Sequence, residues 1–188
     1  MNLYKNGYVV SEVKDNDYTY NVWPFEDMYN DNIAMLLTEE ADNNWFLHYD
    51  MEHIVPDFRF AYKYFRCCQE KGIKANILLY ETSNSEIIVS DNNLPTKLLG
   101  FDCIGNVYYS YLKNEYNDFK EDLNAKGIYL NRYGLFKTLE DTLFYINIRR
   151  QDINNGIALE DFWEELPVRI SLIIPEEQYI DDIDLLGT

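Results

Sequence analysis

The 188-residue sequence has no apolar run of the roughly eighteen residues that a membrane-spanning helix needs. Its longest apolar pieces are short, such as Ile73–Tyr80 and Ile170–Ile174. The first fifteen residues have neither a basic n-region nor a long apolar h-region, so they predict no secretory signal peptide. We therefore expect a cytoplasmic protein that does not bind a membrane.

Cysteine is scarce, with only Cys67, Cys68 and Cys103 in the chain, and none of them has C-x-x-C spacing. The side chains of Cys67 and Cys68 would point about 100° apart on a helix, which disfavours an ordinary disulfide between them. We expect all three to be reduced and mostly buried, as a cytosolic compartment allows.

Signature motifs of catalysis are also missing, because the sequence contains no phosphate-cradling loop and no G-x-S-x-G. The stretch KLLGFDCIGNVYYSYLKN could still place Asp102 and Cys103 on a strand-to-helix turn, where a helix dipole can activate a thiol. Both histidines, however, lie in an acidic segment whose carboxylates would raise a thiol pKa. We expect instead that Cys103 fills core, that Asp102 caps or hydrogen-bonds a loop, and that Gly100 and Gly105 permit close packing.

One cluster has the composition of a metal site. HYDMEH places His48 and His53 around Asp50 and Glu52, and zinc sites use histidine and carboxylate ligands. Histidines five residues apart share neither a helix face nor a strand face, so a site would need a loop. A metal-dependent hydrolase using His48 and His53 is therefore the alternative function. A solvated acidic loop is the favoured interpretation, with no metal and no other cofactor.

Positive charge is missing from two long segments. Eleven acidic residues and no Lys or Arg lie between positions 15 and 58, and five acidic residues and no base follow Arg169. Between Arg59 and Arg169 the sequence is balanced, with fourteen basic and sixteen acidic residues. These two segments thus hold nearly all of the net charge of −17. Such a chain is not expected to bind a nucleic-acid backbone, which requires clustered Lys and Arg.

The first acidic segment also contains many Tyr, Trp and Phe side chains. Carboxylates mixed with Tyr and Trp suit an interface for a basic protein, since charge speeds the encounter and aromatic side chains anchor the complex. A solvated surface whose charge only aids solubility is the simpler alternative. The residues predicted to bind the partner are Asp15, Asp17, Tyr20, Glu26, Asp27, Tyr29, Asp31, Glu39, Glu40, Asp42 and Trp45. The acidic tail, residues 175–188, either extends the same face or frays.

Three helices are predicted by hydrophobic spacing and capping signals. In the first, Asp57 is the expected cap and Gly72 follows the last turn; its apolar face is Phe58, Ala61, Tyr62, Phe65 and Cys68. The second is predicted over Asn106–Lys126. The third begins at the capping-box-like TLED from Thr138, with a face made of Leu139, Leu143, Ile146 and Arg150.

Short strands alternate with these helices. Gly7–Val13 and Tyr18–Trp23 suggest an N-terminal hairpin, and further strands are predicted at 73–81, 97–103 and 167–174. The sequence therefore predicts a single α+β domain over residues 1–188, a mixed β-sheet with three main helices packed on it. An α/β sandwich is the alternative.

LLGFDCIGNVYYSYL (98–112), LNRYGLF (130–136) and the following TLEDTLFY resemble segments of small bacterial immunity proteins of polymorphic and contact-dependent toxin systems. The resemblance covers about 45 residues of hydrophobic pattern with a few Gly, Asp and Asn positions. It implies a cytoplasmic, non-enzymatic protein that neutralises a toxin domain, frequently a basic nuclease, by covering or distorting its active site. No binding motif is shared within that group, so no site residue follows from the resemblance.

Together these observations predict an immunity or inhibitor protein that binds a cognate basic toxin domain by occlusion and charge complementarity. An acidic adaptor protein without a toxin partner is a further alternative.

Overall fold

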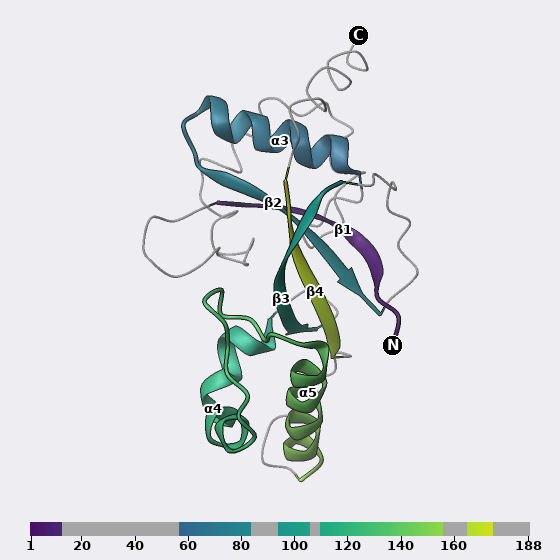
Figure 1. Ribbon diagram of the computed structural model, residues 1–188, viewed down its shortest axis with the longest axis vertical. Helices are drawn as coiled ribbons and strands as arrows, with labels where there is room; N and C mark the ends of the chain where they lie inside the picture. Colours follow the sequence, from purple (N-terminus) through teal and green to yellow (C-terminus); the bar gives the residue numbers. More distant parts are fainter. Residues whose placement is uncertain (13–56, 84–93, 106–109, 156–164, 175–188) are drawn as a thin grey trace.

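The computed structural model describes residues 1–12, 57–83, 94–105, 110–155 and 165–174. Their elements are β1 (Tyr4–Glu12), α3 (Phe58–Glu70), β2 (Ala75–Thr82), β3 (Thr96–Ile104), α4 (Tyr111–Ala125), α5 (Leu139–Asn154) and β4 (Leu166–Ile173). They form a single α+β domain in which three helices pack on a four-stranded sheet of order β1-β2-β4-β3, which confirms the predicted fold class (Figure 1). All three strand pairings are antiparallel, so the sheet has no parallel pair among the described strands, although a mixed sheet was expected.

The strand β1 pairs with β2 along its length, and Tyr8 lies opposite Leu79. The second strand of the predicted hairpin, Tyr18–Trp23, lies outside the described residues. The other three strands lie within two residues of their predicted positions, because each is a short apolar run with polar or proline-containing flanks.

The helix α3 follows the predicted pattern. The carboxylate of Asp57 accepts a hydrogen bond of 2.9 Å from the backbone N–H of Arg59, which satisfies one unpaired donor of the first turn. The five residues of the predicted apolar face are all buried, and they pack on Tyr8, Val10, Ile77 and Leu79 of the sheet. Burial of each large side chain, such as Phe58 and Phe65, contributes about 1.5–3 kcal/mol, so this face fixes α3 to the β1–β2 half of the sheet.

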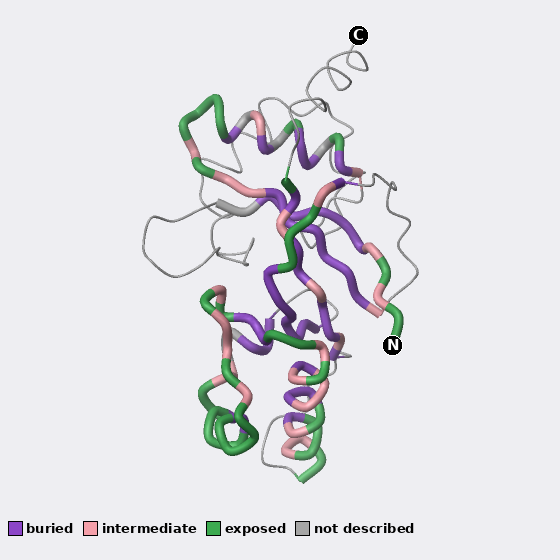
Figure 2. The backbone as a smooth tube through the Cα atoms, viewed as in Figure 1, coloured by how far each residue is buried: buried purple, intermediate pink, exposed green. Residues whose placement is uncertain are grey.

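The helices α4 and α5 lie at the opposite end of the sheet from α3 (Figure 1). They form a second core with Phe101 and Cys103 of β3 and with Phe136 from the turn between the two helices. Figure 2 shows that most residues of the strands between the two helical layers are buried. The sheet therefore joins two separate helix-covered cores.

The segment 131–136 docks tightly on β3. The backbone N–H of Phe101 donates to the carbonyl of Phe136, and the N–H of Phe136 donates to the carbonyl of Phe101, both at 2.9 Å. The side-chain amide of Asn131 donates to the carbonyl of Leu99 at 2.7 Å. A Cβ on Gly100 would lie 2.6 Å from the carbonyl oxygen of Phe136, and its φ is +153°. The predicted need for close packing at Gly100 is thereby confirmed.

Candidate functional site

The residues predicted to bind a partner, from Asp15 to Trp45, lie outside the described residues, as do His48, His53 and the acidic tail. Their roles therefore stay predictions. The sites below come from the described part of the chain.

Asp102 and Cys103 are buried at the end of β3, with exposed fractions of 3% and 0%. The backbone N–H of Cys103 donates to the Asp102 carboxylate at 2.6 Å, and the Ser110 hydroxyl also bonds to this carboxylate. Burial raises the pKa of Asp102 to about 7, and these two hydrogen bonds oppose the rise.

The Cys103 thiol is poorly suited to nucleophilic chemistry. Burial raises its pKa well above the ordinary value, and the charges of Asp102 and Glu165 raise it further. A thiol with a raised pKa stays protonated near neutral pH, whereas the nucleophile is the thiolate. A Cβ on Gly105 would lie 2.9 Å from the hydroxyl of Tyr111, so the turn after β3 is also tightly packed. The pair serves the packing of a strand end, as the sequence predicted.

A buried ionic cluster links α5 to α4 and to the start of β4. The guanidinium of Arg149, which is 2% exposed, donates from Nε and Nη2 to Glu115 at 2.5 and 3.0 Å. It also pairs with Glu165 and lies 3.7 Å from the ring centre of Tyr111. Arg150 donates to the same Glu165 at 2.8 Å. Two carboxylates and a ring thus hold one buried cation, which makes this cluster a structural clamp.

The buried face of α5 differs from the predicted face. Its buried residues are Thr142, Tyr145, Ile146 and Arg149. Of the predicted face, Ile146 is buried, Leu139 and Leu143 are half-buried, and Arg150 is exposed. The sequence could not show that Arg149 meets carboxylates 34 and 16 residues away.

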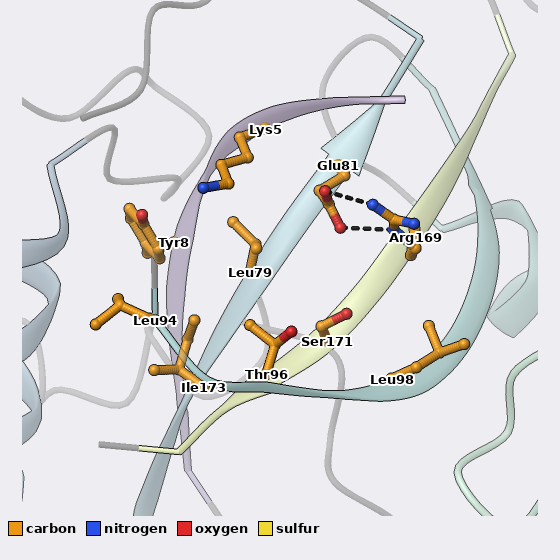
Figure 3. A pocket seen from close by; sticks show the side chains of 10 residues that line it. All are labelled: Lys5, Tyr8, Leu79, Glu81, Leu94, Thr96, Leu98, Arg169, Ser171 and Ile173. Carbon is orange, nitrogen blue, oxygen red and sulfur yellow. Dashed lines mark hydrogen bonds and ion pairs between the residues drawn. The ribbon is translucent and has the colours of Figure 1, made fainter. Parts of the chain in front are cut away.

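A second ion pair joins β4 to β2. Arg169 of β4 donates from Nε and Nη2 to the two carboxylate oxygens of Glu81 on β2, both at 2.6 Å. This bond raises the pKa of Arg169. The pair forms part of a hollow of about 350 Å³, which we call the sheet hollow (Figure 3). Its lining residues are Lys5, Tyr8, Leu79, Glu81, Leu94, Thr96, Leu98, Arg169, Ser171 and Ile173. Sequence reasoning missed this site, because it depends on strand register across 88 positions.

Charge is divided sharply between the described and the remaining residues. The described residues include fifteen basic and thirteen acidic side chains, a net of +2. The remaining positions carry twenty acidic residues and a single base, Lys14, a net of −19. The described residues are therefore close to neutral together, and the negative charge of the protein lies at the remaining positions.

No protein family, curated protein or solved structure matches the chain. Within the described ranges, no three His, Cys, Asp or Glu side chains are grouped so that they could hold a metal ion. No helix among those residues has the length and hydrophobicity required to cross a bilayer.

Proposed function

We propose that the protein is an inhibitor of the immunity-protein kind, which binds and neutralises a cognate basic protein domain. The observation that carries the proposal is the charge division along the sequence: residues 15–58 contain eleven acidic and no basic residues, and five acidic and no basic residues follow Arg169. Charge concentrated in this way attracts a cationic partner over about a Debye length, roughly 10 Å at 0.1 M salt, and raises the rate of encounter.

The proposed contact region is the acidic segment that contains the predicted partner-binding residues. Its carboxylates, such as Glu39, Glu40 and Asp42, would steer the partner, and aromatic residues such as Tyr20 and Trp45 would anchor it. A basic nuclease fits this chemistry best, because a row of carboxylates mimics the phosphates of its substrate. Bound there, the inhibitor would cover the cationic substrate channel of the nuclease.

The described residues support a binding role in a second way. The buried groups that could have served chemistry are used for packing: Cys103 has a raised thiol pKa, and Arg149 is clamped by Glu115 and Glu165.

The direct test mixes the purified protein with the product of the gene immediately upstream of its own. Calorimetry should show a stoichiometric complex, and the toxic activity of that product should fall in proportion to complex formed. If the complex forms and the activity of the partner is unchanged, the protein is an adaptor and the inhibitor proposal is wrong. If the two proteins do not bind at low salt, the proposed cognate pairing is wrong.

A further inference from the structure

The outer edge of β3 is bonded to the rest of the fold along only part of its length. β3 is the last strand in the order β1-β2-β4-β3, so its second side faces no strand of the described sheet. On that side, the backbone N–H and C=O of Phe101 bond to Phe136, and the C=O of Leu99 accepts from the side chain of Asn131. The segment 131–136 therefore covers the edge from Leu99 onward, and the first three residues of β3 bond to no residue of that segment.

The register of β3 shows which backbone groups of these first residues point outward. Ile174 donates from its backbone N–H to the carbonyl of Pro95 at 2.9 Å, so these two residues form a hydrogen-bonded pair beside the β3–β4 ladder. Hydrogen-bonded and non-hydrogen-bonded pairs alternate along an antiparallel ladder. Lys97 therefore bonds to β4, while Thr96 and Leu98 turn their backbone N–H and C=O groups away from it.

The residues with these outward groups lie at the surface. Thr96, Lys97 and Leu98 are all exposed, and Leu98 is 50% exposed although it is a large apolar residue. The outward groups of Thr96 and Leu98, two N–H and two C=O, bond to no other described residue. An extended peptide can join a sheet at such an edge through main-chain hydrogen bonds.

A second copy of this edge is a poor occupant. Two-fold symmetric pairing of the edges is antiparallel, and it uses all the outward groups only when Thr96 of each copy lies opposite Leu98 of the other. The two Lys97 side chains then lie directly opposite each other. Like charges at directly opposed positions destabilise a strand pair, and lysine on an edge strand commonly prevents edge-to-edge association. The edge therefore disfavours its own copy.

The same lysine favours a carboxylate in a pairing strand. An acidic side chain directly opposite Lys97 would form a cross-strand ion pair. Because side chains alternate along a strand, the residues on either side of this acid lie opposite Thr96 and Leu98, on the other face of the sheet. Apolar β-branched side chains at these two positions would cover the exposed part of Leu98 and suit a strand conformation.

We propose that the outer edge of β3 at Thr96–Leu98 accepts an extended, antiparallel segment of a partner protein in which one acidic residue lies between two apolar β-branched residues. The acidic residue lies opposite Lys97, and the backbone groups of its two neighbours bond to Thr96 and Leu98. The segment adds a strand to the sheet beside β3. This edge is separate in sequence from the acidic segments to which the inhibitor function is assigned, so either proposal can fail without the other.

Amide NMR titration of the full chain with the peptide acetyl-Thr-Val-Glu-Val-Thr-amide tests the proposal. Saturable shifts are expected at Thr96, Lys97 and Leu98. Hydrogen exchange of the Thr96 and Leu98 amides should slow when the peptide binds, because these amides gain hydrogen bonds. Exchange at Lys97 should change little, since its amide already bonds to β4. This alternation distinguishes an added strand from a peptide that only covers the surface.

Two methylated peptides test the main-chain pairing directly. A methyl group on the backbone nitrogen of either valine removes a donor that faces β3, and it should weaken binding roughly tenfold or more. A methyl group on the backbone nitrogen of the glutamate lies on the side away from β3, so that peptide should bind within about twofold of the parent peptide.

A charge exchange tests the residue opposite Lys97. The peptide with lysine in place of glutamate should bind the unchanged protein roughly fivefold more weakly than the parent peptide. Lys97→Glu should reverse this preference. Lys120→Glu makes the same change at an exposed position of α4 and should leave the preference as it is in the unchanged protein.

The proposal is overturned by an absence of saturable shifts at Thr96–Leu98, by equal weakening from methylation at valine and at glutamate, or by an unchanged peptide preference in Lys97→Glu. Sedimentation of the unchanged protein alone gives one further outcome. A dimer that Lys97→Glu disrupts or strengthens would show that a second copy occupies this edge, which would also contradict the proposal.

Discussion

Asp102 is the residue whose burial has the clearest consequence for stability. Its folded pKa of about 7 lies above the ordinary value of about 3.9 for an unfolded chain, so the folded state binds the proton more tightly. The contribution of Asp102 to the free energy of unfolding is therefore largest below about pH 4. It falls by at most about 1.4 kcal/mol per pH unit as the pH rises to about 7, and it does not change further above that pH.

Asp102→Asn removes this titration while keeping an oxygen acceptor for the N–H of Cys103. Relative to the unchanged protein, the free energy of unfolding of the variant should rise steadily between pH 4 and pH 7, as measured by urea denaturation. Asp118→Asn, at an exposed position of α4, serves as the control and should show no such trend. If the free energy of unfolding of the Asp102 variant and of the unchanged protein depends on pH in the same way, the pKa of Asp102 is not raised by folding.

Gly100 tests the contact between β3 and the segment 131–136. Gly100→Ala should destabilise the fold by about 3 kcal/mol or more, because the new methyl group would meet the carbonyl of Phe136 and the side chain of Leu135. Gly127→Ala is the matched control: its φ is also positive, at +71°, but nothing lies within 4 Å of the added Cβ. The control should cost only about 1–2 kcal/mol of backbone strain. Equal losses for the two variants would show that close packing is not the reason for glycine at this position.

Among the elements, α5 begins at a local N-cap, Thr138, and its buried side contacts residues that are distant in the sequence. The hydroxyl oxygen of Thr138 accepts a hydrogen bond of 3.1 Å from the backbone N–H of Asp141. Thr138→Ala should therefore lower the free energy of unfolding by about 1 kcal/mol. Thr138→Ser keeps the hydroxyl cap and should lose only a small part of this stabilisation. Urea denaturation of the three proteins measures both values. A loss for Ser as large as that for Ala would mean that the threonine methyl group, not the cap, is responsible.

The helices also show how far sequence reasoning reaches. The face of α3 was predicted correctly residue by residue, because large apolar side chains recur there at helical spacing and meet one surface of the sheet. In α5, apolar residues occur on several sides, and its buried side includes Tyr145 in the second core and Arg149, which pairs with carboxylates on other elements. Pairs such as Glu81–Arg169 depend on strand register in the same way, so the sheet hollow could be found only in three dimensions.

At the scale of the whole molecule, the account depends on where the negative charge is placed. The variant Glu39→Gln/Glu40→Gln/Asp42→Asn should slow association with the basic partner roughly tenfold at low salt, because steering depends on local charge. The control variant Asp118→Asn/Glu121→Gln/Asp122→Asn removes the same three charges from the exposed side of α4. It should change the rate far less. If the α4 variant slows association as much, the net charge of the protein matters and the acidic segment does not.

The most direct test of the inhibitor proposal is the association rate constant of the unchanged protein with the upstream gene product, measured by stopped-flow from about 0.05 M to about 0.5 M salt. The charge division predicts a steep fall in the association rate over this range, with a much smaller change in the dissociation rate. A rate of association that is flat across the range would contradict steering by the acidic segments, and with it the central claim.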